Sequence, residues 1–332
     1  MLIESSAPAR IDLAGGTLDL WPLHLFFDNP PTLNAAIDLY ARVTLKTRRD
    51  RAFTVESKDL GQKARFASIE NLPERHPLEL ILRLVRFYRP KTGLDIVTEC
   101  QAPAGSGIGG SSALNVALNG ALNQLTGSRY PRERLVEIAK NIETQVIRVP
   151  AGIQDYYSAL NGGAQAIDPA CDGVNTRALP LDLVHLTRHF VLCFTGRPRA
   201  SGINNWQVFQ DVVNARKKTH RELAVIGEVS RAMEMELAAG RLDRFPGLFD
   251  AEWQARKRLA PGIATPEMEK LIKTARKAGA LAAKVCGAGG GGCVAFFTLP
   301  ETKTTVMQAL ESAGGRVLPF RFVKRGLVVK TL

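Results

Sequence analysis

Hydrophobic positions recur along the chain with two different periods, which predict strands in some segments and helices in others. Residues 2–13 and 33–47 are rich in apolar and β-branched side chains, and residues 51–57 form a shorter run of the same kind. Such runs are typical of strands. From Leu78 to Tyr88 the apolar residues follow helical spacing, and residues 94–100 predict a further strand. This strand leads directly into a glycine-rich run.

Two helices are predicted after that run. An apolar stripe between residues 114 and 125 ends at Gly127, a residue type that commonly stops a helix. Pro131 opens the next helix at a position where its missing N–H is tolerated, and Pro150 closes it.

In the second half of the chain, the pattern predicts short strands followed by long helices. The last elements are predicted in the order strand, helix, strand. The expected strands are 163–168, 189–194, 294–297 and 316–323, and the expected helices are 223–237, 242–258, 266–278 and 302–313. Because strands and helices do not alternate regularly, the predicted fold class is α+β rather than a doubly wound sheet. We expect two domains, residues 1–175 and 176–332.

The composition is that of a globular protein and limits the classes of function. Of the 332 residues, 45% are hydrophobic and 23% are charged, and no stretch approaches the roughly 20 apolar residues of a membrane span. The first residues show no secretory signal, and the five cysteines contain no CxxC pair. We therefore expect a cytoplasmic protein with reduced thiols and no membrane partner.

The net charge of +12 is compatible with an anionic substrate, a nucleic acid or a membrane surface. The basic residues are spread along the chain, however, and the sets at 216–221 and 256–258 lie in helical patterns that we interpret as solvated faces. No zinc-finger spacing or aromatic RNA-binding pattern accompanies them, so no nucleic-acid partner is expected. Monomer and homodimer both remain open.

The first candidate for chemistry is the run from Pro103 to Ala113, in which four of the six residues 105–110 are glycine. Glycine lets the backbone turn tightly and aim several N–H groups at one anion, and the helix that follows adds its positive end. Ser111 and Ser112 place hydroxyls at the helix start. The alternative is an ordinary connection with a serine N-cap, but the run holds more glycines than a cap requires, which favours phosphate binding.

Two other segments leave alternatives open. Five of the six residues 287–292 are glycine, so this loop either touches another backbone closely or lines a ligand. The segment from Arg10 to Asp19 contains Gly15 and Gly16, and it is either a turn with solvated charges or the mouth of a site.

Two carboxylates near the middle of the chain are further candidates. Glu143 lies at the edge of an apolar helical stripe, where a carboxylate needs a cation, hydrogen bonds or a metal ion. A salt bridge to Arg148 is the simpler interpretation. Asp155 follows the helix closed by Pro150, in a segment that we expect to be a loop, where an isolated aspartate is usually a cap or turn residue.

Taken together, three segments resemble the motifs of the GHMP kinase superfamily, which includes galactokinases, homoserine kinases, mevalonate kinases and phosphomevalonate kinases. They are residues 8–19, residues 103–113 and residues 287–292, and they occur in the family order. The resemblance implies a ribosomal S5 domain 2-like N-terminal domain, a ferredoxin-like C-terminal domain, and ATP with Mg²⁺ as cofactors.

The resemblance also implies roles for individual residues. Asp155 would be the catalytic base, with Arg10 beside it, and Ser111 and Glu143 would ligate Mg²⁺. The ATP loop would consist of Pro103, Gly105, Ser106, Gly107, Ile108, Gly109, Gly110, Ser111 and Ser112. Candidate contacts to the acceptor are Asp19, Thr17, Arg199 and Gly289, with Arg197 as a further possible anion contact.

Two departures from the family pattern refine the expected activity. Gly110 stands where the family usually has the first of two serines, and Gly-Gly-Thr-Leu-Asp at 15–19 differs from the galactokinase sequence. Together with Gln154-Asp155-Tyr156, the second departure is closer to heptose 7-phosphate kinases and related sugar-1-kinases. The expected activity is ATP-dependent phosphorylation of a hydroxyl of a sugar or sugar phosphate. The alternatives are a mevalonate-type kinase and a non-catalytic sensor of ATP or sugar with the same fold.

Overall fold

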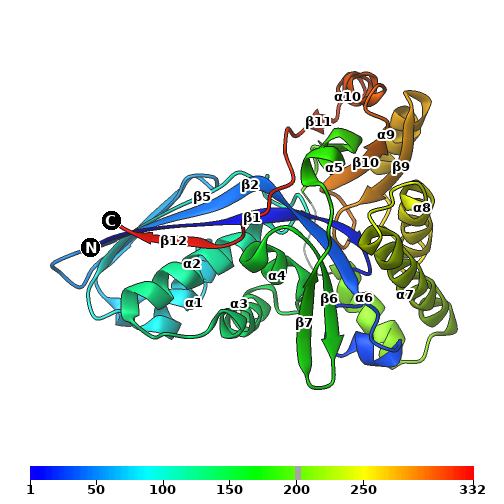
Figure 1. The fold of residues 1–332 in the computed structure, drawn as a ribbon. Helices are drawn as coiled ribbons and strands as arrows, with labels where there is room; N and C mark the ends of the chain where they lie inside the picture. Colours follow the sequence, from blue (N-terminus) through cyan, green and yellow to red (C-terminus); the bar gives the residue numbers. More distant parts are fainter. Residues whose placement is uncertain (199–202) are drawn as a thin grey trace.

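The computed structural model describes residues 1–198 and 203–332, which form two packed halves, each built from a sheet and helices (Figure 1). The strands of the first sheet are β1 (Leu2–Ala14), β2 (Thr32–Thr47), β3 (Phe53–Ser57), β4 (Gln62–Phe66), β5 (Leu94–Cys100), β6 (Ala164–Ala170), β7 (Gly173–Ala178) and β12 (Val328–Thr331). The strands of the second sheet are β8 (Phe190–Phe194), β9 (Ala280–Val285), β10 (Cys293–Thr298) and β11 (Arg316–Val317).

The helices fall into two groups along the chain. The first half contains α1 (Glu79–Tyr88), α2 (Gly110–Thr126), α3 (Arg132–Ile147) and α4 (Gln154–Asn161), with short 3₁₀ turns η1 (Leu23–Phe26) and η2 (Ile69–Asn71). The second half contains α5 (Leu183–His189), α6 (Ile203–Val213), α7 (Lys217–Ala238), α8 (Phe245–Arg256), α9 (Pro266–Lys277) and α10 (Lys303–Ser312). The predicted strands and helices are largely confirmed; β4, β7, β9, β12 and helices α4 to α6 were not predicted.

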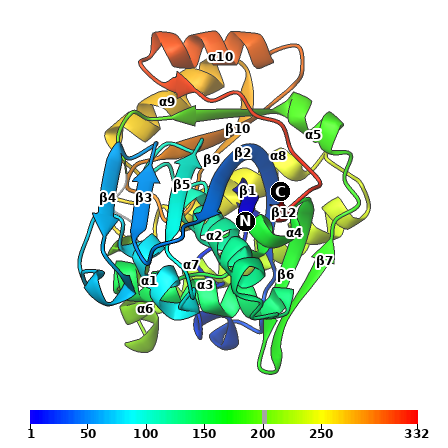
Figure 2. The same ribbon diagram turned by 90° about the vertical axis from the view of Figure 1, so that its left-hand side faces the viewer.

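The first sheet is organised around the long strand β2, and its order is β12-β1-β2-β5-β3-β4 (Figure 2). β2 pairs antiparallel with β1 along almost its whole length. On its other side, Ala41 to Thr47 pair with β5, whereas Thr32 to Ala35 pair with β6. β2 therefore belongs to three ladders, and its N-terminal part carries the β6–β7 hairpin toward the other half of the molecule (Figure 1).

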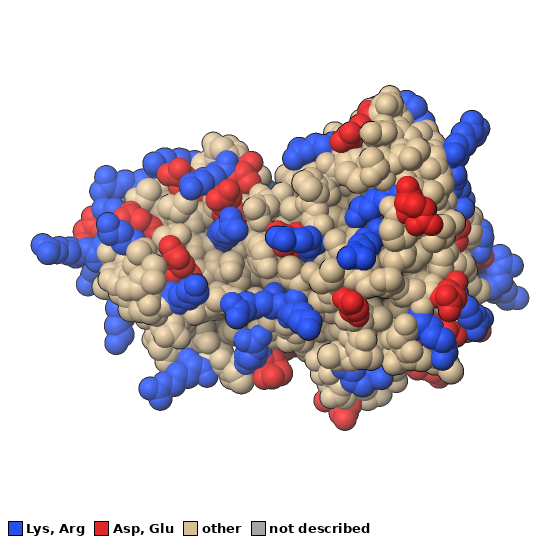
Figure 3. Space-filling view, turned by 45° about the horizontal axis from the view of Figure 1, so that its top comes forward, with Lys and Arg blue, Asp and Glu red and all other residues tan. Residues whose placement is uncertain are grey.

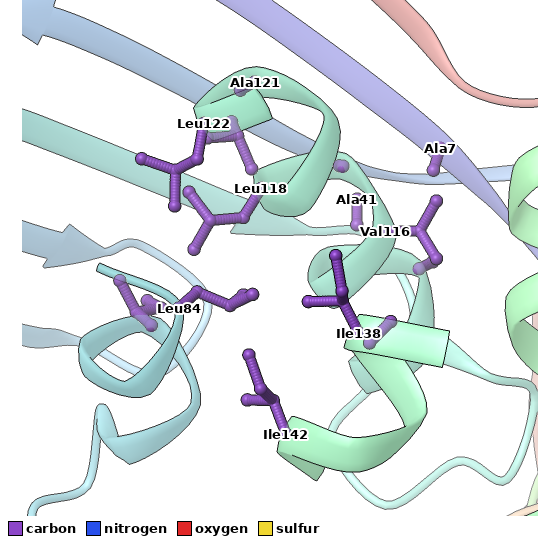
Figure 4. Close-up of a cluster of buried hydrophobic side chains, with 14 of the residues drawn as sticks. Ala7, Ala41, Leu84, Val116, Leu118, Ala121, Leu122, Ile138 and Ile142 are labelled. Atoms are coloured by element: carbon purple, nitrogen blue, oxygen red, sulfur yellow. The ribbon is translucent and has the colours of Figure 1, made fainter. Parts of the chain in front are cut away.

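Helices α1, α2 and α3 cover one face of this sheet (Figures 1 and 2). Leu84 of α1, Leu118 and Leu122 of α2, and Ile138 and Ile142 of α3 converge in one buried cluster (Figure 4). Burial of each such side chain contributes about 1.5–3 kcal/mol. Because α2 packs against both β1 and β2, the cluster fixes the direction of α2 and the position of its N-terminus.

The second half contains a four-stranded antiparallel sheet in the order β11-β8-β10-β9. β8 and β10 are buried along their whole length. Phe190 of β8 makes edge contacts with Phe245 and Phe249 of α8 and with Phe297 of β10. This aromatic cluster holds α8 against the sheet and so positions its last turn, which ends at Arg256.

The chain returns to the first sheet at its end, where β12 pairs antiparallel with the outer side of β1 (Figure 1). The strand predicted at 316–323 is shorter than expected: β11 covers two residues, and Phe322 makes only an isolated bridge to Ile37. The predicted domain division at residues 175 and 176 falls within β7 and remains a prediction.

On the face drawn in Figure 3, Lys and Arg side chains are spread over both halves and interspersed with Asp and Glu. None of the helices in the described ranges combines the length and apolar character that a membrane span requires.

Candidate active site

A cavity of about 430 Å³ lies where the two halves meet. This volume is within the range of small-molecule sites. Its walls include the start of α2, the segment around Asp155, the Gly16–Asp19 loop and Arg256 of α8. Residues from all three predicted motifs therefore meet at one place.

The glycine run forms the centre of the cavity wall. Gly105, Gly107 and Gly109 have φ values of +68°, +77° and +79°, which L-residues with side chains rarely adopt. α2 begins at Gly110, and no side chain caps it. Because the first N–H groups of a helix have no intrahelical acceptor, this end of α2 presents donors and a positive dipole to an anion.

Most of the predicted ATP loop lines the cavity, and one residue does not. The lining residues are Pro103, Gly105, Ser106, Gly107, Gly109, Gly110, Ser111 and Ser112. The side chain of Ile108 instead lies in the hydrophobic core, and its carbonyl accepts the N–H of Arg10 at 2.9 Å. Its contribution is to join the loop to β1.

The structure gives a physical reason for Gly110 in place of serine. A Cβ at residue 110 would lie 3.0 Å from Cβ of Ala102 and 3.1 Å from Sγ of Cys100. These distances are shorter than ordinary van der Waals contact, so a side chain at residue 110 would require Ala102 and Cys100 to shift by a few tenths of an ångström.

Ser112 and Glu143 are in direct contact across α2 and α3. The Ser112 hydroxyl donates to Oε2 of Glu143 at 3.1 Å, and Glu143 is buried. Burial raises the pKa of Glu143, although hydroxyls of Ser111 and Tyr156 act in the opposite direction. The salt bridge to Arg148 is absent from the ion pairs of the described residues. Glu143 is therefore held by hydroxyls rather than by a cation.

The side-chain oxygens of Ser111, Ser112 and Glu143 suit a divalent cation such as Mg²⁺. Ser111 is exposed toward the cavity and lies beside Ser112, so two hydroxyls and one carboxylate face the same space. Mg²⁺ prefers such oxygen ligands and keeps room for water and phosphate. Among the described residues there is no group of three or more His, Cys, Asp or Glu side chains placed to hold a metal ion.

Arg10 and Asp155 form the central ion pair of the site. Nη2 and Nε of Arg10 lie 2.6 and 2.7 Å from Oδ1 of Asp155, and Nη1 donates to the carbonyl of Gly107 at 2.8 Å. Burial alone would lower the pKa of Arg10, but Asp155 and then Asp12 raise it above its ordinary value. Arg10 thus keeps its charge and holds Asp155 beside the phosphate loop.

The expectation that Asp155 lies in a loop is wrong, because the residue is in the first turn of α4. A Cβ at Gly109 would lie 3.3 Å from Cγ of Asp155. The absent side chain at residue 109 therefore lets the carboxylate approach the start of α2.

Asp19 and Thr17 line the end of the cavity next to Gln154 and Arg256. Oδ2 of Asp19 accepts the backbone N–H of Gln154 at 3.0 Å. Burial raises the pKa of Asp19, and the bond from Gln154 opposes that shift. Thr17 accepts a hydrogen bond from Arg256 at 3.0 Å and contacts Asn205 at 3.4 Å. This end of the cavity combines carboxylate, hydroxyl and amide groups.

A buried charge network behind this end was not predicted. Lys284 pairs with Asp12, donates to the carbonyl of Asp12 at 3.2 Å, and lies 3.7 Å from Glu252. Glu252 in turn pairs with Arg256. Burial would raise the pKa of Asp12, but Lys284, then Arg10 and Arg256, hold it well below its ordinary value.

The interpretation of residues 256–258 as a solvated face is therefore wrong for Arg256, which is only 2% exposed. A signal for this was present in the sequence. Phe245, Phe249, Glu252 and Arg256 follow one another at helical spacing, so both charges lie on the apolar face of α8.

The sequence left open whether the second glycine run lines a site or packs closely against another backbone, and the run does both. Gly287 and Ala288 line the cavity, and the N–H of Gly287 donates to Asp12. Gly292 packs against the first glycine run, since a Cβ there would lie 2.6 Å from the carbonyl oxygen of Ser106. Gly289, a predicted acceptor contact, is not among the lining residues and packs against Ile263.

The remaining predicted contacts lie on the segment before α6. Arg197 is exposed and pairs with Glu267 at 2.8 Å, away from the cavity wall. Arg199 lies outside the described residues.

Comparison with known proteins agrees with this geometry. Residues 77–163 match the GHMP kinases N terminal domain, and residues 235–316 match the GHMP kinases C terminal domain. Both halves thus carry the parts of one class of phosphotransferase, with the phosphate loop in the first match. The chain belongs to the GHMP kinase family.

Individual relatives extend the similarity over nearly the whole chain. The chain is 27% identical to D-glycero-alpha-D-manno-heptose 7-phosphate kinase of Campylobacter jejuni over 98% of both proteins. It is 28% identical to mevalonate kinase of Methanothermobacter thermautotrophicus, over 99% of this chain and 100% of the relative. The solved structure of a D-glycero-D-manno-heptose 1-phosphate kinase from Bacteroides thetaiotaomicron matches with a TM-score of 0.80 and 25% identity, covering 99% of each chain.

These findings confirm the predicted two-domain α+β kinase fold. They also establish the chain as a small-molecule kinase, a phosphotransferase with an alcohol group as acceptor.

Proposed function

We propose that this kinase transfers the γ-phosphoryl group of ATP to a hydroxyl of a sugar or sugar phosphate, with Asp155 as the general base. The observation that carries this proposal is the ion pair of the buried Arg10 with Asp155 beside the uncapped start of α2. This pair supports the proposal because a fixed carboxylate stands next to backbone N–H groups that suit a phosphate. Phosphoryl transfer depends mainly on such positioning and on charge neutralisation.

In this proposal each group has one task. The N–H groups of residues 105–112 bind the phosphates, except that of Ser106, which donates to the carbonyl of Pro103 at 3.0 Å. Ser111 with Glu143 would hold Mg²⁺, which supplies positive charge to the phosphate oxygens when bound. Asp155 takes the proton of the acceptor hydroxyl. The new bond joins the acceptor oxygen to the γ-phosphorus, the bond from that phosphorus to the ADP oxygen breaks, and ADP leaves.

The sugar acceptor is supported by the polar end of the cavity and by the names of two relatives. Asp19, Thr17 and Gln154 surround this end, and all three can exchange hydrogen bonds with hydroxyls. Relatives that phosphorylate heptose phosphates share the whole length of the chain. A mevalonate-type acceptor is the second candidate, because a mevalonate kinase is 28% identical to this chain.

The test is release of ADP from Mg-ATP with galactose, mannose, a heptose 7-phosphate and mevalonate as acceptors. We expect turnover with a sugar-class acceptor and a loss of about 10² or more in kcat for Asp155→Asn, as for a lost general base. The matched control is Asp168→Asn, which removes another carboxylate paired with an arginine, Arg177 at 2.8 Å, outside the cavity. Full activity in Asp155→Asn would refute the role of Asp155, and preference for mevalonate would refute the sugar acceptor.

A further inference from the structure

Gln154, at the start of α4, has a side-chain oxygen with no hydrogen-bond partner among residues 1–198 and 203–332. The residue is 6% exposed and lines the cavity, yet its Oε1 is buried without a hydrogen-bond partner. Its backbone is fixed on both sides, because its N–H donates to Asp19 and its carbonyl accepts Nδ2 of Asn34 at 3.1 Å. Buried polar atoms are nearly always paired, so an orphaned oxygen in a cavity wall indicates a missing ligand.

Arg256 approaches the same point from the other half of the molecule. A Cβ on Gly16 would lie 2.9 Å from Nε2 of Gln154 and 3.2 Å from Nη2 of Arg256. The two side-chain ends therefore converge over the bare backbone of Gly16, which itself lines the cavity. Gly16 has no positive φ value, so the close approach of these groups accounts for the glycine.

Arg256 also retains a donor. Its recorded bonds go to Glu252, to the carbonyl of Gly16 and to the hydroxyl of Thr17. These use four of the five N–H groups of a guanidinium and leave one on Nη1 without a partner among the described residues. Gln154 and Arg256, which both line the cavity beside Gly16, thus retain one unused acceptor, Oε1 of Gln154, and one unused donor, on Nη1 of Arg256.

We propose that Gln154 and Arg256 are specificity-determining residues that bind two neighbouring hydroxyls of the acceptor. One hydroxyl donates to Oε1 of Gln154, and the other accepts from Nη1 of Arg256. Arg256 is already paired with Glu252, and Asp155 with Arg10. Asp19 lies beside Gln154 and has no such cation in the described part of the chain, so a carboxylate or phosphate at this corner of the cavity would meet the Asp19 carboxyl group and an amide oxygen. The corner therefore selects the neutral diol part of a sugar, and the inference rests on the proposed sugar kinase function.

The test combines a variant with altered acceptors. Gln154→Met keeps the length of the side chain and removes the amide. We measure kcat/KM for the panel sugar that the wild type phosphorylates best and for each of its monodeoxy analogues. For the wild type, loss of the hydroxyl bound by Gln154 should lower kcat/KM by about 10- to 100-fold, the scale of an unsatisfied buried hydrogen-bonding group.

The effects of Gln154→Met and of removing the hydroxyl that Gln154 binds should not be additive. Gln154→Met should lower kcat/KM for the parent sugar by a similar factor but should cause little further loss with that one analogue, because the interaction is already absent. The affinity for ATP should stay within about twofold of the wild type. The matched control is Gln165→Met, which alters a buried glutamine that also has an unpartnered amide atom but lies on β6 outside the cavity; its kcat/KM should not change.

Two results would overturn the inference while leaving the proposed function intact. One is an equal loss for the parent sugar and all its analogues in Gln154→Met, which would indicate a structural role. The other is no loss at all. If the wild type phosphorylates mevalonate in preference to every sugar, or phosphorylates no sugar, the proposed function fails and the diol inference fails with it.

Discussion

Replacing Lys284 with methionine should destabilise the protein strongly, because the buried Asp12 would lose its main cation. Both side chains are at most 1% exposed, so water cannot take the place of the ammonium group. Breaking a buried ion pair by removing one partner typically costs about 3–5 kcal/mol. Asp12 would retain Arg10 at 3.8 Å and the N–H of Gly287 at 3.2 Å, which places the expected loss at the lower end, about 3 kcal/mol.

The assay is urea unfolding of the wild type, Lys284→Met and the double variant Asp12→Asn with Lys284→Met. The double variant removes both charges and keeps similar shapes, so it should recover most of the lost free energy of unfolding. Its recovery separates an uncompensated charge from a simple loss of packing. A loss below about 1 kcal/mol in Lys284→Met, or no recovery in the double variant, would refute this reasoning.

The same pair has a defined pH dependence. Because the pKa of Asp12 is lowered in the folded protein, its stabilising contribution is present above the unfolded pKa, about 3.9, and is lost as the pH falls toward the folded value. In Lys284→Met the isolated carboxylate is instead relieved by protonation. The stability difference between the two proteins should therefore be largest near neutral pH and should shrink as the pH falls through about 4.

Two further predictions concern the phosphate loop and the metal site. Gly109→Ala should lose about 1–2 kcal/mol of stability from its left-handed backbone and at least about tenfold in kcat, because the new Cβ would lie 3.3 Å from Asp155. Gly127→Ala, at the other end of α2 with a φ of +66° and nothing within 4 Å, should show a similar stability loss with unchanged kcat; equal kcat losses would contradict the contact argument. Burial raises the pKa of Glu143, so its charge destabilises the fold above the unfolded carboxyl pKa of about 4.3 and not below it. Glu143→Gln should therefore unfold at higher urea than the wild type at pH 7 in the presence of a chelator, lose that advantage near pH 4, and show reduced kcat with Mg-ATP; equal urea midpoints at pH 7 would contradict it.

Local patterns predicted most of the fold because most elements are defined by their own residues. The stripe of α2 and its stop at Gly127 are visible without any partner. In contrast, α4 begins at Gln154 with no capping side chain at its N-cap residue, Ile153, and burial of Tyr156 and Leu160 in the core stabilises it. β12 depends on a partner at the opposite end of the chain, since Val329 pairs with Ser5. Elements specified by distant contacts leave little local signal.

The residues of the candidate site were likewise predictable only in part. Arg10, Glu143 and Asp155 were predicted because they occur in or near recognisable motifs, and the structure brings them to one cavity. Arg256 and Lys284 were missed because their carboxylate partners lie on other elements or one helical turn away. Arg256 stands in a run of basic residues within a helical pattern, and such a run usually indicates a solvated surface. Only the apolar spacing of α8 distinguished Arg256 from that case.

The contact between the two glycine runs joins the two halves of the molecule backbone to backbone. The N–H of Cys293 donates to the carbonyl of Ser106 at 2.7 Å, and a Cβ at Gly292 would lie 2.6 Å from that carbonyl oxygen. Any side chain at residue 292 would therefore force the second glycine run away from the phosphate loop. The absence of a side chain at this one residue thus sets how closely the second half approaches the phosphate loop.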